Sequence, residues 1–153
     1  MPNIQAEQTI NAPIARVYEI SQDYSVRYEW DPFPDYLRNL DGGNGMPFVG
    51  REVEGRAKSG VFMRVRFVRV KAPEVAAITM VKGPIFLEKF AGSWRFRALS
   101  DHQTLARFSY SLSAPAWCAW LLNPLMRYYF SRVVAQRLSG LKRYCEAQCP
   151  IGH

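Results

Sequence analysis

The sequence predicts a single α+β domain, in which a curved antiparallel sheet closes around a long C-terminal helix and leaves an apolar cavity. Three observations lead to this fold class. The chain starts with one alternating strand and two short helical segments, and a run of about five alternating strands follows. The last part repeats apolar residues at helical spacing. A sheet with one apolar face must be covered, and only this final helix is large enough to cover it.

The length and composition agree with one domain of ordinary size. The chain has 153 residues, of which 48% are hydrophobic and 14% are aromatic. This apolar content excludes a disordered chain, and the length is sufficient to bury a core without disulfides or metals. Large aromatic side chains either fill a core or line a pocket, so their abundance leaves both uses open.

The first predicted elements are a strand and two short helices. Residues 4–10 alternate in polarity, which predicts a strand with one wet face. Asn11 is the expected cap of the first helix, which has Pro13 at its start and continues to about Ser21. A second, aromatic-rich piece at 24–30 ends there because a residue before a proline avoids helical geometry.

Residues 32–50 are rich in Pro, Asp, Asn and Gly, and this composition predicts a long connection near a functional opening. Trp30 and Asp31 lie just before it. Both could border the mouth of a cavity, or Trp30 could fill the core while Asp31 and the following proline only end the helix. The sequence leaves the two interpretations open.

The middle of the chain predicts five strands, at 51–58, 61–70, 75–81, 86–99 and 104–112. In the second of them the alternation slips at 68–70, which predicts a bulge. The outward positions of these strands collect charged residues of both signs, so cross-strand ion pairs are expected on the outer face. These residues are Glu52, Glu54, Arg64, Arg66, Arg95, Arg97 and Arg107.

The final helix is predicted at 125–147, with Asn123 as its cap and Pro124 in its first turn. Apolar residues recur along it at helical spacing and form one stripe. Arg137 interrupts this stripe, and its long side chain is expected to reach solvent at the stripe's edge.

A sheet that curls around one helix fills poorly in its middle, so the inward positions of these elements predict a ligand cavity. Aromatic and aliphatic side chains dominate these positions, as in most small-molecule sites. The predicted lining consists of Tyr18, Trp30, Met63, Val65, Phe67, Phe86, Phe90, Trp94, Phe96, Phe108, Met126, Tyr129, Phe130 and Val133.

Five segments, in order along nearly the whole chain, are similar to one known family. They are Ile-Asn-Ala-Pro at 10–13 with Val-Tyr at 17–18, Tyr-Glu-Trp-Asp-Pro-Phe at 28–33, Gly-Ser-Trp-Arg-Phe at 92–96, Thr-Leu-Ala-Arg-Phe at 104–108, and residues 138–146. Together they resemble the polyketide cyclase/dehydrase-like branch of the START and birch-pollen-allergen superfamily (SRPBCC). The resemblance implies the helix-grip fold and a hydrophobic cavity. Members bind lipids, sterols, hormones and quinones or cyclise polyketides, so it does not imply one activity.

Glu88 and Tyr110 are the polar side chains that strand alternation places inside the cavity. Glu88 is expected between Phe86 and Phe90, where desolvation would raise the pKa of its carboxyl and suit it to acid or base catalysis. The Tyr110 hydroxyl would orient a ligand. The alternatives are that Glu88 reaches solvent or pairs with an arginine, and that Tyr110 makes only a structural hydrogen bond.

The segment 115–122, Pro-Ala-Trp-Cys-Ala-Trp-Leu-Leu, holds more large apolar residues than the core needs. Trp117, Trp120 and Leu121 are about one helical turn apart. Exposed, they would form a patch that contacts an acidic membrane or a partner, and the net charge of +7 supports this interpretation. The alternatives are a lid over the cavity and a dimer contact, so the chain could be a monomer or a dimer.

Metal and nucleotide chemistry are not expected, so no cofactor is predicted. The cysteines are Cys118, Cys145 and Cys149, an odd number, and the two histidines, His102 and His153, are far apart in the sequence. There is no glycine-rich phosphate loop. Basic residues are scattered and never form a run longer than two, which argues against nucleic acid. Neither a signal peptide nor a membrane span is evident, so a soluble cytoplasmic protein is expected.

These observations lead to three functional hypotheses. The first is a carrier or sensor that binds a hydrophobic small molecule, such as a lipid, a polyketide-like aromatic or a quinone, in its internal cavity. The second is a cofactor-independent cyclase or dehydratase that uses Glu88 and Tyr110. The third is a module that binds a membrane or a partner through Trp117 and Trp120.

Overall fold

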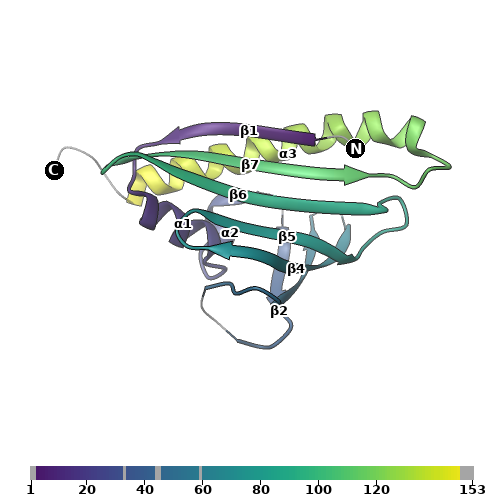
Figure 1. Cartoon of the computed structure of the whole chain (residues 1–153), viewed down its shortest axis with the longest axis horizontal. Coiled ribbons are helices and arrows are strands. Elements are labelled where there is room, and N and C mark those ends of the chain that lie inside the picture. The colour runs from purple at the N-terminus through teal and green to yellow at the C-terminus, as the bar shows by residue number, and fades with distance from the viewer. Residues whose placement is uncertain (1–2, 33, 44–45, 59, 149–153) are drawn as a thin grey trace.

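The computed structural model describes residues 3–32, 34–43, 46–58 and 60–148 and confirms the predicted fold class. Short helices follow the first strand, and a long helix is the last described element (Figure 1). The elements are β1 (Asn3–Ile10), α1 (Ile14–Gln22), α2 (Arg27–Trp30), β2 (Pro34–Asn39), β3 (Glu52–Ala57), β4 (Phe62–Lys71), β5 (Val75–Lys82), β6 (Lys89–Ser100), β7 (Gln103–Ser113) and α3 (Ala119–Gln148).

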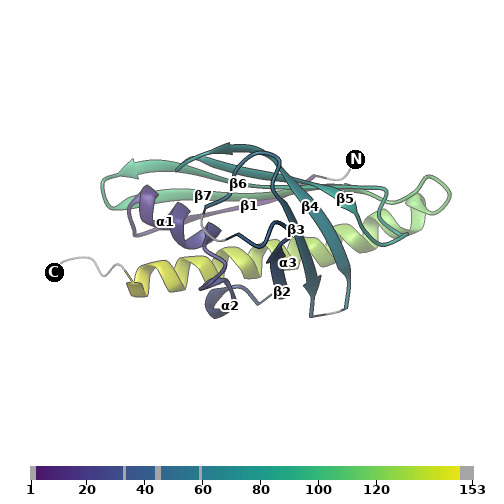
Figure 2. The same ribbon diagram turned by 90° about the horizontal axis from the view of Figure 1, so that it is seen from below.

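One antiparallel sheet of seven strands forms the body of the protein, in the order β1-β7-β6-β5-β4-β3-β2. The sheet curves around α3, which lies along its concave side (Figure 2). Because α3 contacts β1 and β7 directly, the sheet is closed at that edge and separates from the helix towards β3 and β4. The cavity forms where the two layers diverge.

The inward faces of β6 and β7 supply the aromatic part of the core. Trp94 is paired in register with Phe108, and their rings meet edge to face with centroids 4.1 Å apart. Phe90 and Tyr110 follow on the same faces, with centroids 4.7 Å apart. This alternation confirms the phase that the sequence predicts for both strands. The bulge is also confirmed, since the register of β4 shifts between Phe67 and Arg69.

The outer face carries the expected ion pairs between neighbouring strands. Arg66 on β4 pairs with Glu52 on β3 at 2.7 Å, and Arg107 on β7 pairs with Glu7 on β1 at 3.2 Å. All four side chains are at least partly exposed, so each pair contributes only about 0–1 kcal/mol to the free energy of unfolding.

Strand β2 lies within residues 32–50, for which the sequence predicts a connection, so that prediction is wrong for 34–39. It pairs only with β3 and forms the edge of the sheet. A proline at the first position and alternating polar residues are tolerated at an edge, where half of the backbone hydrogen-bonding groups face away from the sheet. The composition of an edge strand such as β2 is therefore similar to that of a loop, and it did not reveal the strand.

The predicted helix caps were wrong. The N-cap of α1 is Pro13, which makes no side-chain capping bond, and the backbone N–H of Asn11 instead donates to Glu146 at 2.9 Å. Helix α3 begins at Ala119 and continues through Pro124, while the Asn123 side chain accepts a hydrogen bond from the Ala114 N–H at 3.0 Å. Within the described residues, no helix has the length and hydropathy needed to span a membrane.

Candidate ligand cavity and its buried ion cluster

A cavity of about 480 Å³ lies between the concave face of the sheet and α3, and its walls are mostly apolar. Ten of the residues that the sequence predicts for the lining do line it. They are Met63, Val65, Phe67, Phe86, Phe90, Trp94, Phe108, Met126, Tyr129 and Phe130.

The other four predicted lining residues are Tyr18, Trp30, Phe96 and Val133, and they are buried beside the cavity without reaching its wall. Tyr18 packs edge to face on Phe96, with ring centroids 6.1 Å apart. Trp30 packs in the same way on Trp94, at 5.9 Å. An inward direction is therefore not sufficient to place a residue in the cavity, because neighbouring rings fill the space in front of it.

A second hollow, of about 560 Å³, lies on the outer face of the sheet. Small and polar side chains surround it, among them Ala77, Thr79, Ser93 and Ser109. None of the described residues that line it is charged, whereas the inner cavity combines apolar walls with Arg27 and Arg137. The inner cavity is consequently the candidate site.

The polar part of the inner cavity is an ion cluster on one carboxylate. Asp31 accepts hydrogen bonds from Arg137 Nε at 3.0 Å and from Arg27 Nη1 at 3.2 Å, both at its Oδ2 atom. Arg137 Nη2 lies 2.8 Å from the same oxygen, and Arg137 Nη1 donates to the Tyr110 hydroxyl. Arg27 Nη2 donates to the Ser21 carbonyl at 2.8 Å.

The cluster is buried, and its arginines also contact aromatic rings. Arg27, Asp31 and Arg137 are 5%, 3% and 8% exposed. The guanidinium carbon of Arg137 is 4.9 Å from the centre of the Phe108 ring, and that of Arg27 is 5.1 Å from the Trp30 ring. These contacts let the arginines keep their charge in an apolar surrounding.

Local structure explains how these residues meet. Arg27 and Asp31 are four residues apart across the short helix α2, so both side chains lie on one side of it. Gly140 is one turn beyond Arg137 on α3, and a Cβ atom there would lie 2.0 Å from the Trp30 carbonyl oxygen. The absence of a side chain at Gly140 lets the end of α2 approach α3, and this contact brings Asp31 to Arg137.

Burial and mutual charge determine the protonation of the cluster. Burial raises the pKa of Tyr110, although Arg137 opposes this, so the phenol stays protonated at neutral pH. Burial lowers the pKa of Arg27, and Asp31 counteracts it. For Arg137, burial also acts downward, but Asp31 and Tyr110 outweigh it and the pKa is raised overall. Both guanidinium groups therefore remain charged.

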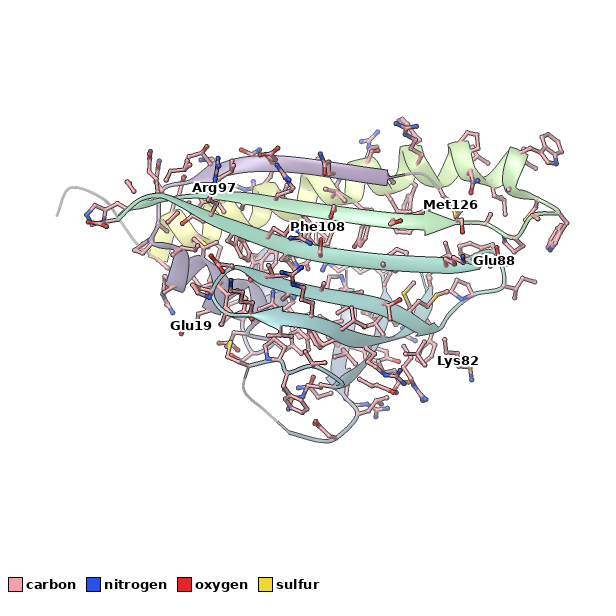
Figure 3. All side chains as sticks on the ribbon, in the orientation of Figure 1. Glu19, Lys82, Glu88, Arg97, Phe108 and Met126 are labelled. Carbon is pink, nitrogen blue, oxygen red and sulfur yellow. The ribbon has the colours of Figure 1, made fainter. Side chains whose placement is uncertain are left out.

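The expected inward position of Glu88 is wrong. Glu88 is exposed, precedes β6, and lies at the end of the sheet where that strand starts (Figure 3). Leu87 is buried in its place, because the turn at 85–86 interrupts the alternation that was extended back from Phe90. Tyr110 does line the cavity, so the pair of Glu88 and Tyr110 is not brought together.

Sequence reasoning missed the ion cluster. Arg137 was expected at a solvent-exposed edge but is buried and bound to Asp31. A signal was present: an arginine inside an apolar helical stripe needs a buried acidic partner, and Asp31 directly follows the aromatic segment 24–30. No rule of spacing relates positions that are so far apart in the chain, so the pairing itself was not predictable.

Trp117, Trp120 and Leu121 do not form a packed lid, since they are 75%, 78% and 51% exposed. The neighbouring Leu122 and Leu125 line the cavity instead. The start of α3 thus borders the cavity with one side and exposes large apolar side chains on the other.

A curved antiparallel sheet that holds a long helix on its concave side is the helix-grip fold. Residues 1–146 match the family model described as "Polyketide cyclase / dehydrase and lipid transport". The chain therefore belongs to this START-like family, as the resemblance of its segments implied.

Solved structures with the same fold have low sequence identity to this chain. A protein from Thermus thermophilus is 17% identical with a TM-score of 0.78, over 96% of this chain and 99% of that one. The Zhui aromatase/cyclase from a Streptomyces species is 16% identical with a TM-score of 0.77, over 96% and 94%. A point mutant of norcoclaurine synthase from Thalictrum flavum, in complex with a transition-state analogue, is 12% identical with a TM-score of 0.74, over 96% and 95%. No curated protein matches the sequence.

Proposed function

We propose that this protein binds a hydrophobic small molecule in the inner cavity and acts as its carrier or sensor. The observation that supports the proposal is the cavity itself, with about 480 Å³ and mostly apolar walls. Pockets for drug-sized ligands commonly have roughly 300–1,000 Å³ and similar linings. A lipid, a polyketide-like aromatic or a quinone fits this description.

The aromatic walls favour binding because they are already in place. Phe90, Trp94 and Phe108 pack against neighbouring rings around the space, so they lose little freedom when a ligand enters. Each Å² of apolar surface removed from water contributes about 25 cal/mol to binding. A preformed pocket retains more of this contribution than one that must be ordered first.

The first experiment asks whether the cavity holds an apolar compound. Solvent extraction of the purified protein, followed by mass spectrometry, should find one, and the fluorescent probe 1-anilinonaphthalene-8-sulfonate should bind with about one site per chain. Ala76→Phe places a ring in the cavity and should reduce probe binding at least about tenfold. Ala98→Phe introduces the same ring at an exposed position of β6 and should leave binding unchanged.

An empty extract together with no probe binding, in a protein that is folded by circular dichroism, would overturn the proposal. Equal binding by the Ala76→Phe and Ala98→Phe variants would also count against it, because the probe would then be bound elsewhere.

Cyclase or dehydratase chemistry is the second candidate, and Tyr110 is the observation that favours it. Tyr110 lines the cavity, and its hydroxyl accepts a hydrogen bond from Arg137, which leaves the hydroxyl proton for donation to a ligand oxygen. Burial raises the pKa of Tyr110, which suits it to donation and not to proton abstraction. A synthetic poly-β-ketone thioester should then be cyclised by the protein, and Tyr110→Phe should lose turnover while retaining binding. No turnover by the unmodified protein would exclude this candidate for that substrate.

A further inference from the structure

The inner cavity holds one more positive charge than negative charge. Arg27 and Arg137 both line it, and the Asp31 carboxylate is shared between them. Arg56 lines the cavity too, but it is half exposed and pairs with Asp35 at 2.6 Å on the surface. Among the described residues, the Nε–H of Arg27 is also buried without a hydrogen-bond acceptor.

Such an arrangement is costly in an empty protein. A buried charge without a full partner costs several kcal/mol of free energy, and a buried donor without an acceptor adds about 1–3 kcal/mol. A monoanionic group in the cavity beside Arg27 would neutralise the excess charge. A carboxylate is suited to this, because it matches a guanidinium in shape as well as in charge.

The rest of the cavity suits an apolar chain or ring system. Along α3 the lining extends from Leu122 to Arg137, which corresponds to about 22 Å of helix. The charged side chains are at the Arg137 end, and the Leu122 end has leucine, methionine and aromatic side chains. The polarity therefore changes along the cavity in the way that an amphiphile's does.

We infer that the ligand is a monocarboxylate amphiphile, whose carboxylate lies against Arg27 and whose apolar part extends towards Met126. This inference rests on the proposed binding function and names its ligand class. A fatty acid and an aromatic polyketide acid share the relevant chemistry.

The test compares acids with their neutral esters. The fluorescent cis-parinaric acid and its methyl ester are titrated into the protein, in parallel with anthracene-9-carboxylic acid and its methyl ester. The acid of at least one pair should bind about tenfold more tightly than its ester. A difference of this size is what one charge-assisted hydrogen bond contributes to the binding free energy. The pair with the larger preference for the acid over the ester shows whether the ligand is a fatty acid or an aromatic acid.

Arg27→Gln should reduce this preference to about one while ester binding stays unchanged, because Asp31 keeps its pairing with Arg137. Arg56→Gln is the matched control, since Arg56 also lines the cavity but lies at its exposed side, and the preference should persist. Equal binding of acids and esters by the unmodified protein overturns the inference and leaves the binding function intact. If none of the four probes binds, the inference is overturned as well, and the extraction and the anilinonaphthalene probe decide separately whether the proposed function fails.

A different observation concerns the outer surface at the start of α3. Five large side chains are exposed there, with exposed fractions between 51% and 78%. They are Trp117, Trp120, Leu121, Leu125 and Tyr128, and we call them the α3 apolar face. The loop before β6, with Ile85 at 83% exposure, lies at the same end of the molecule in both ribbon views (Figures 1 and 2).

Positive charge predominates around this face, since Lys82 and Lys89 flank Glu88, the acidic residue of the loop before β6 (Figure 3). No Asp or Glu occurs in the sequence between Asp101 and Glu146, whereas Arg127 and Arg132 are exposed on α3. Tryptophan and tyrosine are the residues that concentrate at membrane–water interfaces, and neighbouring arginines add attraction to anionic headgroups. Leu125 belongs both to the face and to the cavity lining, so the surface is continuous with the candidate site.

The geometry points to an anionic lipid bilayer as the partner of the α3 apolar face. In that orientation the apolar end of the cavity borders the bilayer, and an amphiphile can pass between them with little exposure to water. A second protein copy would bury the same side chains but would not explain the predominance of positive charge.

Sedimentation with phosphatidylcholine vesicles, with and without phosphatidylserine, tests this contact. Binding should require phosphatidylserine and weaken with added salt. The double variant Trp117→Ala/Trp120→Ala should bind at least about tenfold more weakly, because it lacks the two indoles that the bilayer would bury. Leu99→Ala, at an exposed site near the end of β6, is the control and should bind normally.

No binding to the mixed vesicles, or binding that persists in the double variant, overturns the membrane contact. The molecular mass without vesicles is the second measurement. If it doubles as the protein concentration rises, and does not double in the double variant, the partner is a second copy and the membrane contact is overturned.

Discussion

The two ends of the cavity differ in chemistry and in how firmly they are built. At one end α2 and the middle of α3 hold Arg27, Asp31 and Arg137 in a buried network with fixed distances. At the other end Trp117, in the turn before α3, and Trp120, in its first turn, are exposed to solvent. The first end depends on residues that are far apart in the sequence, and the second on residues within one segment. The buried ion cluster and the exposed apolar side chains are thus separated along one helix.

Removal of the shared carboxylate is the strongest way to break the buried end. Asp31→Ala leaves two guanidinium groups buried without their partner, and we expect a loss of about 3–5 kcal/mol in the free energy of unfolding. Urea denaturation measures it. Asp35→Ala is the matched control, because the ion pair of Asp35 with Arg56 is about half exposed and should contribute only about 0–1 kcal/mol. Similar losses in the two variants would mean that the cluster does not hold α2 against α3.

Tyr110→Phe is expected to have the next largest effect. The variant keeps the ring contacts with Phe90 and Phe108 but removes the oxygen that accepts from Arg137. A hydrogen bond to a charged group contributes about 1.5–3 kcal/mol, and we expect a loss of that order in urea denaturation. Tyr36→Phe, on the edge strand β2, should change stability by less than about 0.5 kcal/mol. An unchanged free energy of unfolding in Tyr110→Phe would indicate that water replaces the hydroxyl.

A smaller, pH-dependent effect is expected near the end of α3. The pKa of Glu146 is lowered overall: burial acts to raise it, but the hydrogen bonds from Lys142 and from the Asn11 N–H outweigh this. A carboxyl with a lowered pKa stabilises the fold above its unfolded pKa, about 4.3, and this contribution disappears as the pH falls through the lower folded value. The melting temperature of Glu146→Gln should be below that of the unmodified protein at pH 7, and the difference should vanish in strong acid. A constant difference across this range would contradict the assignment.

The smallest effect on stability is expected at the exposed end. Trp120→Ser removes a side chain that is 78% exposed, so the free energy of unfolding should change by less than about 0.5 kcal/mol. Thermal unfolding of the variant measures this. Trp94→Ser, in the core, should lose several kcal/mol, about 3–5 or more. A large loss at Trp120 would mean that the α3 apolar face belongs to the core, and the contrast between the two ends would disappear.

The sequence predicted most of the fold and part of the site. The period of β4, β6 and β7 identified the inward residues Phe67, Trp94 and Phe108, because alternation is a property of each strand alone. The prediction failed where local structure interrupts that period. Glu88 follows the turn at 85–86, and a shift of phase by one residue moves a side chain to the other face.

What the sequence by itself determined is the alternation of the strands, the length and apolar stripe of the final helix, and the family to which they belong. Only the tertiary structure decided which polar groups are inside. Arg137 and Asp31 are 106 positions apart, and they meet because Gly140 lets α2 pack closely on α3. A local pattern carries no information about such a contact, since it depends on how whole elements pack. The exposure of Trp117 and Trp120 was also decided by tertiary packing, because the rest of the fold does not cover these side chains.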